Sequence, residues 1–67
     1  MSTQSLAVTV GRVNYQRATG AISQQVWAIV MENICDLVRE YNFSWTEINS
    51  LIPSHDFYIN QEVAVSA

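Results

Sequence analysis

The stretch of sequence that decides the fold is SQQVWAIVMENICDLVREY, residues 23–41. Its apolar residues recur every three or four positions, which is the spacing of one face of an α-helix. Ser23 suits the N-cap position, because its hydroxyl can accept a hydrogen bond from the backbone of the first turn. The pattern predicts a long helix over residues 24–41, at the centre of the fold.

This predicted helix is apolar around more of its circumference than a single neighbour would cover. Its apolar side chains fill an arc of about 200° on a helical wheel, roughly twice the width that a helix on the surface of a small monomer needs. The residues on the arc are Val26, Trp27, Ala28, Val30, Met31, Ile34, Cys35, Leu37, Val38 and Tyr41. The helix therefore needs neighbours on two sides, and we expect the second to be another copy of the chain or a partner protein.

A second, shorter helix is predicted over residues 45–52. Ser44 and Glu47 form the S-x-x-E pattern of a capping box, in which each side chain bonds the backbone N–H of the other residue. Asn42 suits the left-handed backbone that ends the preceding helix. Pro53 ends the short helix, because its ring nitrogen has no hydrogen to donate and the residue before it is pushed towards extended geometry.

Both ends of the chain show the alternation of apolar and polar residues that is typical of a β-strand. Residues 6–10 alternate in this way, and the alternation resumes over residues 12–16. Gly11, between them, is either the turn of a hairpin or a bulge in one longer strand. Residues 57–65 alternate again and predict a C-terminal strand.

Together these elements predict the α+β fold class. We expect a single small domain over residues 1–67, with residues 1–5 frayed. In it the long central helix and the short helix pack on a small antiparallel sheet that joins the N- and C-terminal strands.

A domain this small usually needs disulfides, a metal ion or a partner to complete its core. One cysteine and one histidine provide neither an intrachain disulfide nor a structural zinc site. We therefore expect a homodimer, with no metal and no cofactor.

The charges of the chain are few and unevenly distributed. Residues 1–31 carry two arginines and no acidic residue, whereas residues 32–67 carry six acidic residues and one arginine, for a formal net charge of −3. This balance disfavours non-specific binding to nucleic acid or to an anionic membrane. The longest apolar run, residues 26–31, is too short to span a bilayer, and the first residues lack the features of a secretory signal. With one free thiol, the chain is expected in the cytoplasm.

Enzymatic activity is not expected. Ser54, His55 and Asp56 are the residue types of a hydrolytic triad, but the side chains of consecutive residues point in divergent directions. Cys35 lies in the middle of the predicted long helix on its apolar arc, where a thiol is buried and unreactive.

The leading functional hypothesis is a protein–protein interaction module, a small acidic modulator or inhibitor that occupies a surface of a larger partner with a basic surface. An apolar patch would bind the partner, ringed by carboxylates of which three follow one helix face at four-residue spacing. The patch residues are Trp27, Ile34, Tyr41 and Trp45, and the carboxylates are Glu32, Asp36, Glu40 and Glu47. The alternative interpretation of the acidic row is a solvated helix face.

The second hypothesis is DNA binding. Arg12, Asn14 and Gln16 share one face of the predicted strand, and these residue types read base edges in the major groove, which a β-ribbon can enter. The two helices over residues 34–48 resemble the helix–turn–helix part of a ribbon-helix-helix repressor. The resemblance implies a dimeric DNA-binding repressor or antitoxin. The other interpretation of the three residues is the solvated face of an edge strand.

Overall fold

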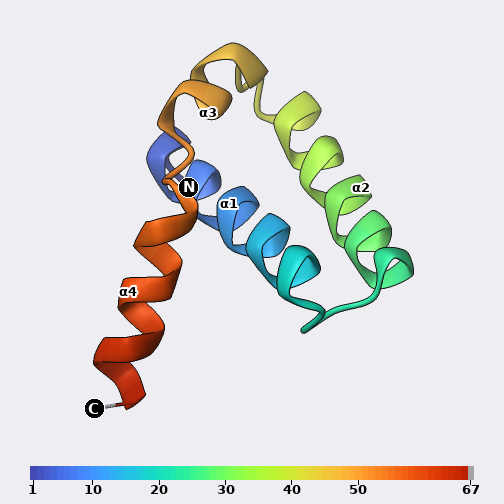
Figure 1. The fold of residues 1–67 in the computed structure, drawn as a ribbon. Coiled ribbons are helices and arrows are strands. Elements are labelled where there is room, and N and C mark those ends of the chain that lie inside the picture. Colours follow the sequence, from blue (N-terminus) through green and yellow to red (C-terminus); the bar gives the residue numbers. More distant parts are fainter. Residues whose placement is uncertain (67) are drawn as a thin grey trace.

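The computed structural model describes the backbone of residues 1–66 and the side chains of residues 1–62. That part of the chain forms four α-helices (Figure 1). They are α1 (Thr3–Thr19), α2 (Gln24–Glu40), α3 (Trp45–Leu51) and α4 (His55–Ser66). No strand occurs between residues 1 and 66, so the predicted α+β fold with an antiparallel sheet is wrong.

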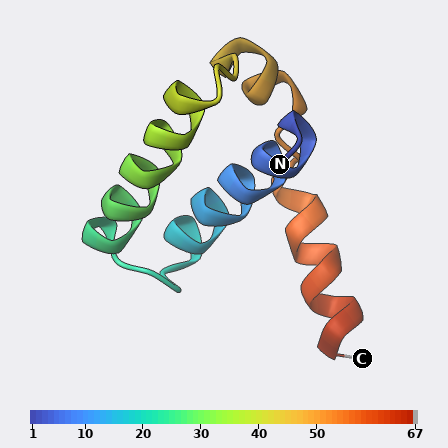
Figure 2. The same ribbon diagram turned by 180° about the vertical axis from the view of Figure 1, so that it is seen from behind.

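The helix at the centre of the fold is α1, because α2, α3 and α4 all pack against it. A short loop joins α1 to α2, which runs back beside α1 in the opposite direction (Figures 1 and 2). The chain then crosses through α3 to the N-terminal half of α1, and α4 leaves from there on the side away from α2. The long helix predicted at the centre is therefore at one edge.

The predicted N-terminal hairpin or strand is part of α1. Leu6, Val10 and Val13 are buried, and their spacing of four and three residues places them on one side of a helix. The strand prediction failed because the small and β-branched residues of this segment also alternate at period two. Burial against α2 and α3 decides in favour of the helical period, against the strand preference of valine and threonine.

Local signals also mark both ends of α1. The Ser2 hydroxyl caps the N-terminus by accepting a hydrogen bond of 3.1 Å from the backbone N–H of Ser5. Gly20 ends the helix with φ at +81°, in the left-handed region that favours glycine. The helix thus begins within residues 1–5, the segment that was expected to be frayed.

The predicted C-terminal strand is the helix α4. Within it, Tyr58 is buried against α1, and Glu62 lies one helical turn further on the same side. These two contacts with α1 follow the helical period rather than the period of two that predicted a strand. The side chains of Val63 and Val65, which completed that strand pattern, lie outside the described residues.

The two helices predicted in the middle of the chain are confirmed as α2 and α3. The Ser23 hydroxyl accepts a hydrogen bond of 3.2 Å from the backbone N–H of Val26, and the Ser44 hydroxyl accepts one of 3.4 Å from that of Glu47. Asn42 has φ at +57°, as predicted for the residue that ends the long helix. These caps were predictable because each acts on backbone within three residues of itself.

The core lies where α1 meets the other three helices. Its buried hydrophobic side chains are Leu6, Ala7, Val10, Val13, Ile34, Val38, Ile48 and Tyr58. Gly11 is also buried, in the interior of α1, so it is neither a hairpin turn nor a β-bulge.

Candidate functional site

One side of α2 carries apolar side chains that the described part of the chain leaves partly open. Val26 and Tyr41 have exposed fractions of 46% and 64%, and Val30 and Leu37 between them are partly buried. Their spacings of four, seven and four residues place all four within about 60° on a helical wheel. We call Val26, Val30, Leu37 and Tyr41 the α2 stripe.

The C-terminal end of the stripe broadens into a shallow apolar hollow of about 270 Å³. Met1, Leu37, Tyr41 and Phe43 line it. The rings of Tyr41 and Phe43 lie 6.4 Å apart between centroids in a tilted arrangement. The hollow thus joins the first residue of the chain to the end of α2 in one apolar surface.

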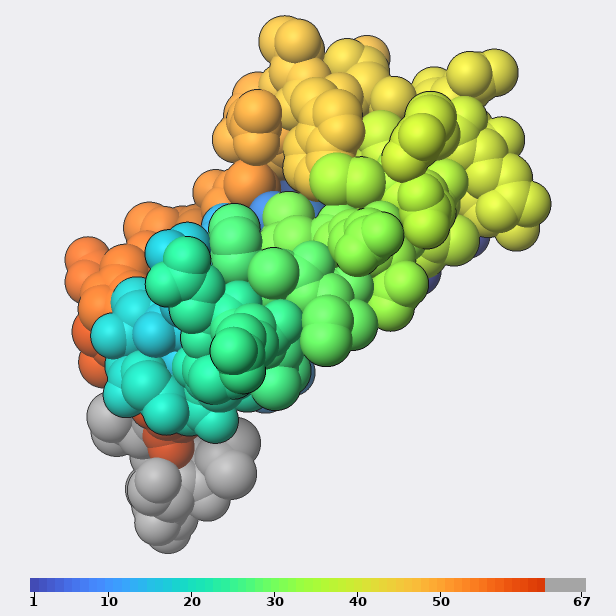
Figure 3. Space-filling view, turned by 90° about the vertical axis from the view of Figure 1, so that its right-hand side faces the viewer, coloured from blue at the N-terminus to red at the C-terminus, as the bar shows by residue number. Residues whose placement is uncertain are grey.

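The stripe borders the buried side of α2, and its residue Val30 also packs against the core. Ile34 and Val38, on the neighbouring side of the helix, are each 5% exposed and belong to the core. In Figures 1 and 2 α2 stands at one edge, with α1 beside it and α3 only at its end. Figure 3 looks onto this edge, where the green surface of α2 lies uncovered at the front. The second neighbour that the wide apolar arc predicted is therefore absent from the described part of this chain.

An acidic row lies next to the stripe, on the side of α2 that is turned away from α1. Glu32, Asp36 and Glu40 are exposed and follow one another at one-turn spacing. Asp36 makes an ion pair of 2.9 Å with Arg39, and both side chains are largely exposed. An exposed pair of this kind adds little to stability, so the row shapes the charge of this surface more than the strength of the fold.

Trp27, one of the four predicted patch residues, is engaged with α1. Its indole N–H donates a hydrogen bond of 2.9 Å to the Asn14 side-chain oxygen. The Arg17 guanidinium lies over its ring, 4.2 Å from the centroid. Trp27 therefore joins α1 to α2, and it does not extend the stripe.

The other predicted patch residues are also dispersed. Ile34 is in the core, and Trp45 is partly buried and packs against the core from α3. Tyr41 is the one of the four that the structure places on the open surface. Glu47 is exposed on α3, apart from the acidic row of α2.

The three residues proposed to read DNA do not share a face. In α1, Arg12 and Gln16 lie one turn apart on one side, while Asn14 points towards α2 and Trp27. The β-ribbon on which the DNA hypothesis depended does not occur within residues 1–66. The prediction that a β-ribbon presents these three residues to a major groove is therefore wrong.

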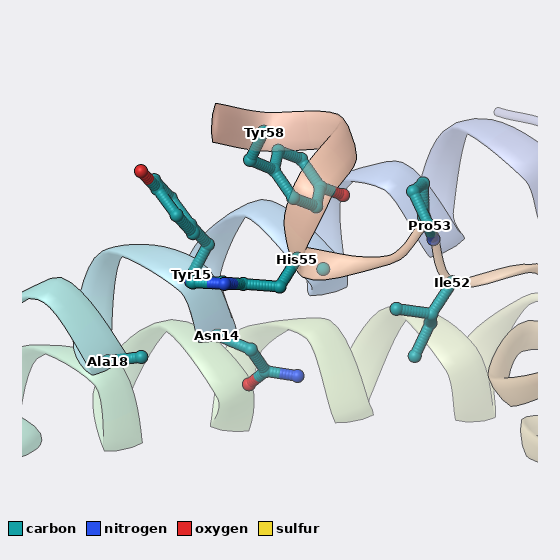
Figure 4. Close-up of a pocket in the computed structure, with 8 residues that line it drawn as sticks. Asn14, Tyr15, Ala18, Ile52, Pro53, His55 and Tyr58 are labelled. Atoms are coloured by element: carbon teal, nitrogen blue, oxygen red, sulfur yellow. The ribbon is translucent and has the colours of Figure 1, made fainter. Parts of the chain in front are cut away.

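A second hollow, of about 260 Å³, lies between α1 and the start of α4 (Figure 4). Tyr15 lies beside both aromatic residues of α4 that line it, with ring centroids 4.9 Å from His55 and 5.6 Å from Tyr58. The Tyr15 hydroxyl donates a hydrogen bond of 2.8 Å to Glu62, and the Tyr58 hydroxyl donates one of 2.8 Å to the Val8 carbonyl. These two hydrogen bonds hold α4 against α1, so the hollow is part of the packing contact between the two helices.

The same contacts perturb the two phenols. The hydrogen bond from Tyr15 to Glu62 raises the pKa of Tyr15, and burial and the Glu62 charge add to this effect. Burial raises the pKa of Tyr58, against a smaller lowering by the Arg12 charge. Both environments therefore favour the protonated phenol.

The remaining candidates for chemistry stay apart. The His55 ring packs against Tyr15 in a tilted arrangement, and the Ser54 carbonyl accepts a hydrogen bond of 3.0 Å from the backbone N–H of Phe57. Cys35 is a free, partly buried thiol. Over the described residues, no three His, Cys, Asp or Glu side chains lie together as a metal site would require.

None of the helices in the described part of the chain has the length and hydropathy of a bilayer-crossing segment.

The sequence places Val26, Val30 and Leu37 on the apolar arc but does not single them out as a binding surface. Their position at one edge of the arc was the available signal. A single packed neighbour covers the centre of an apolar arc first and leaves an edge open.

Comparisons with protein-family models, with curated proteins and with solved structures found no match.

Proposed function

We propose that this chain is a non-enzymatic interaction protein that acts in the cytoplasm, as a modulator or inhibitor, by covering a surface of a larger protein. The observation that carries the proposal is the α2 stripe, a row of apolar side chains that the described part of the chain covers only in part. Helical binding faces of this kind present anchors at successive turns to an apolar groove or helix.

Tyr41 is the natural anchor of the stripe. Its ring is the most exposed of the four side chains, and tyrosine is enriched among the residues that dominate binding energy. Burying an apolar side chain contributes about 25 cal/mol for each Å² removed from water. A partner that covers Tyr41 and the hollow beside it would therefore gain most of its apolar contact at this end of α2.

The acidic row supports a partner with basic groups. Glu32, Asp36 and Glu40 would lie along one margin of the bound surface, where charges steer encounter and set orientation more than they raise affinity. Because these carboxylates are exposed, their contribution would weaken as salt is added.

Two further observations are compatible with this role. The His55 ring packs against Tyr15 in a tilted arrangement, which gives this histidine a structural contact between α4 and α1. The free thiol of Cys35 suits a reducing compartment, which supports the cytoplasm as the place of action.

The proposal is tested by capture followed by reconstitution with purified components. The chain carries a photo-crosslinker at Met1, beside the hollow, and the captured protein is identified and purified. Its affinity is then measured for the wild type, for Leu37→Ser and for Tyr41→Ser. Leu51→Ser is the matched control, since Leu51 is 47% exposed but lies on α3, away from the stripe.

We expect both stripe variants to bind at least tenfold more weakly and the control to bind within twofold of the wild type. Higher salt should weaken binding by the wild type. Circular dichroism establishes that each variant keeps its helices. Equal affinity of the wild type and both stripe variants would contradict the proposal.

A further inference from the structure

We infer that a second copy of this chain covers the α2 stripe when the larger partner is absent, with the two α2 helices antiparallel about a twofold axis near residue 33. The inference rests on the proposed function in one respect: the second copy and the larger partner protein would bind the same stripe. Self-association would then regulate access to it.

The spacing of the stripe is the first argument. Positions 26, 30, 37 and 41 are symmetric about a midpoint between residues 33 and 34. An antiparallel copy therefore sets Val26 opposite Tyr41 and Val30 opposite Leu37, so that each smaller side chain meets a larger one. A parallel copy would set valine against valine and tyrosine against tyrosine, which leaves gaps at one end and crowding at the other.

The charges of α2 are the second argument. The first eight residues of the helix carry no charge, while the last nine carry three acidic residues and one arginine. Antiparallel pairing places the acidic half of each copy beside the uncharged half of the other. The first turn of α2 contains no acidic residue, so its partial positive charge is free to attract Glu40 of the second copy. Parallel pairing would place the two acidic halves at the same end of the pair.

Of the two residues that flank the proposed axis, Ile34 is buried in the core and Asn33 is exposed. Asn33 lies beside the stripe, so in the antiparallel pair it meets the same residue of the second copy. A side-chain amide has both donor and acceptor atoms and can pair with an identical amide across a twofold axis. A single polar residue of this kind favours one register over others.

Disulfide trapping tests the orientation. In a Cys35→Ser background, Val30→Cys and Leu37→Cys chains are oxidised separately and as a mixture. We expect the mixture to yield a covalent dimer and each chain alone to yield little, because residue 30 lies opposite residue 37 of the second copy and not opposite residue 30. Asn33→Cys alone should form a covalent dimer. Crosslinking of Val30→Cys alone at the level of the mixture, or no crosslinking in any sample, would overturn the inference.

Sedimentation equilibrium of the untagged chain completes the test. The wild type and Leu51→Ser should have twice the chain mass at micromolar concentration, and Leu37→Ser and Tyr41→Ser should each have the mass of one chain. A wild type that stays monomeric, together with partner binding lost in Leu37→Ser, would refute the second copy and leave the proposed function standing. Dimers that dissociate on Leu37→Ser, together with unchanged partner binding, would refute the proposed function alone.

Discussion

The Tyr58 hydroxyl in α4 lies directly against Gly11 in α1 and donates a 2.8 Å hydrogen bond to the Val8 carbonyl one turn before it. A methyl group on residue 11 would overlap that hydroxyl. Glycine inside a helix costs about 0.5–1 kcal/mol relative to alanine. The close approach of Tyr58 explains why residue 11 is glycine. The same contact holds α4 against α1, the helix at the centre of the fold.

Gly11→Ala should therefore destabilise the chain, although it raises helix propensity. We expect a loss of about 1–3 kcal/mol in the free energy of unfolding, as for other overpacked sites. In the Tyr58→Phe background the same substitution should cost much less, because the overlapping oxygen is gone. Urea denaturation of the two single variants and the double variant measures this coupling. Strictly additive losses would show that the two residues do not meet.

Ile34 and Ile29 are a matched pair on α2. Ile34 is 5% exposed and Ile29 is 61% exposed. Ile34→Ala should lower the free energy of unfolding by about 2–4 kcal/mol, since it opens a cavity in the core. Ile29→Ala should change it by less than about 0.5 kcal/mol. Similar effects at both positions would mean that α2 is rotated relative to the structure.

Asn14 and Arg12 distinguish a structural role from a DNA-reading role. Asn14→Ala removes the acceptor of the Trp27 indole N–H and should cost about 1 kcal/mol of stability. Arg12 is exposed, and Arg12→Ala should be nearly neutral. Thermal unfolding followed by circular dichroism tests both. If each variant instead keeps wild-type stability, the contact between Asn14 and Trp27 is not made in solution.

Alkaline pH should loosen the attachment of α4. The pKa values of Tyr15 and Tyr58 are raised above their ordinary value of 10.0, so the folded chain favours the protonated phenols. Their contribution to stability is fully present below that pH and is lost as the pH rises through the raised values. Unfolding by urea from pH 8 to 12 should show this loss in the wild type and a smaller loss in Tyr58→Phe. Tyr41→Phe is the control, and a loss in Tyr58→Phe as large as in the control would contradict the prediction.

The caps and the wide apolar arc were the features that sequence reasoning predicted best. A capping serine acts on backbone within its own first turn, and the arc of α2 depends on its own residues alone. The arc also indicated that one neighbour would leave part of α2 uncovered, and the exposed side chains of the stripe are that part.

The segments that became α1 and α4 were not predictable in the same way. In α1, Leu6 and Val10 fit both a strand of period two and a helix of period 3.6. The choice depends on Ile34 and Ile48, which lie far along the chain and belong to the same core cluster. The predicted patch also depended on contacts that lie far apart in the sequence. It therefore combined Ile34, which is buried in the core, with Tyr41, which is exposed.

The central claim is that the α2 stripe is the surface through which this chain meets other protein molecules. The most direct measurement is methyl and aromatic NMR of the isotopically labelled chain while the purified, unlabelled partner protein is added stepwise. The signals of Val26, Val30, Leu37 and Tyr41 should change together as the partner is added, while those of the buried Leu6 and Ile48 stay constant. Constant stripe signals throughout, or shifts confined to the α4 residues, would contradict the claim.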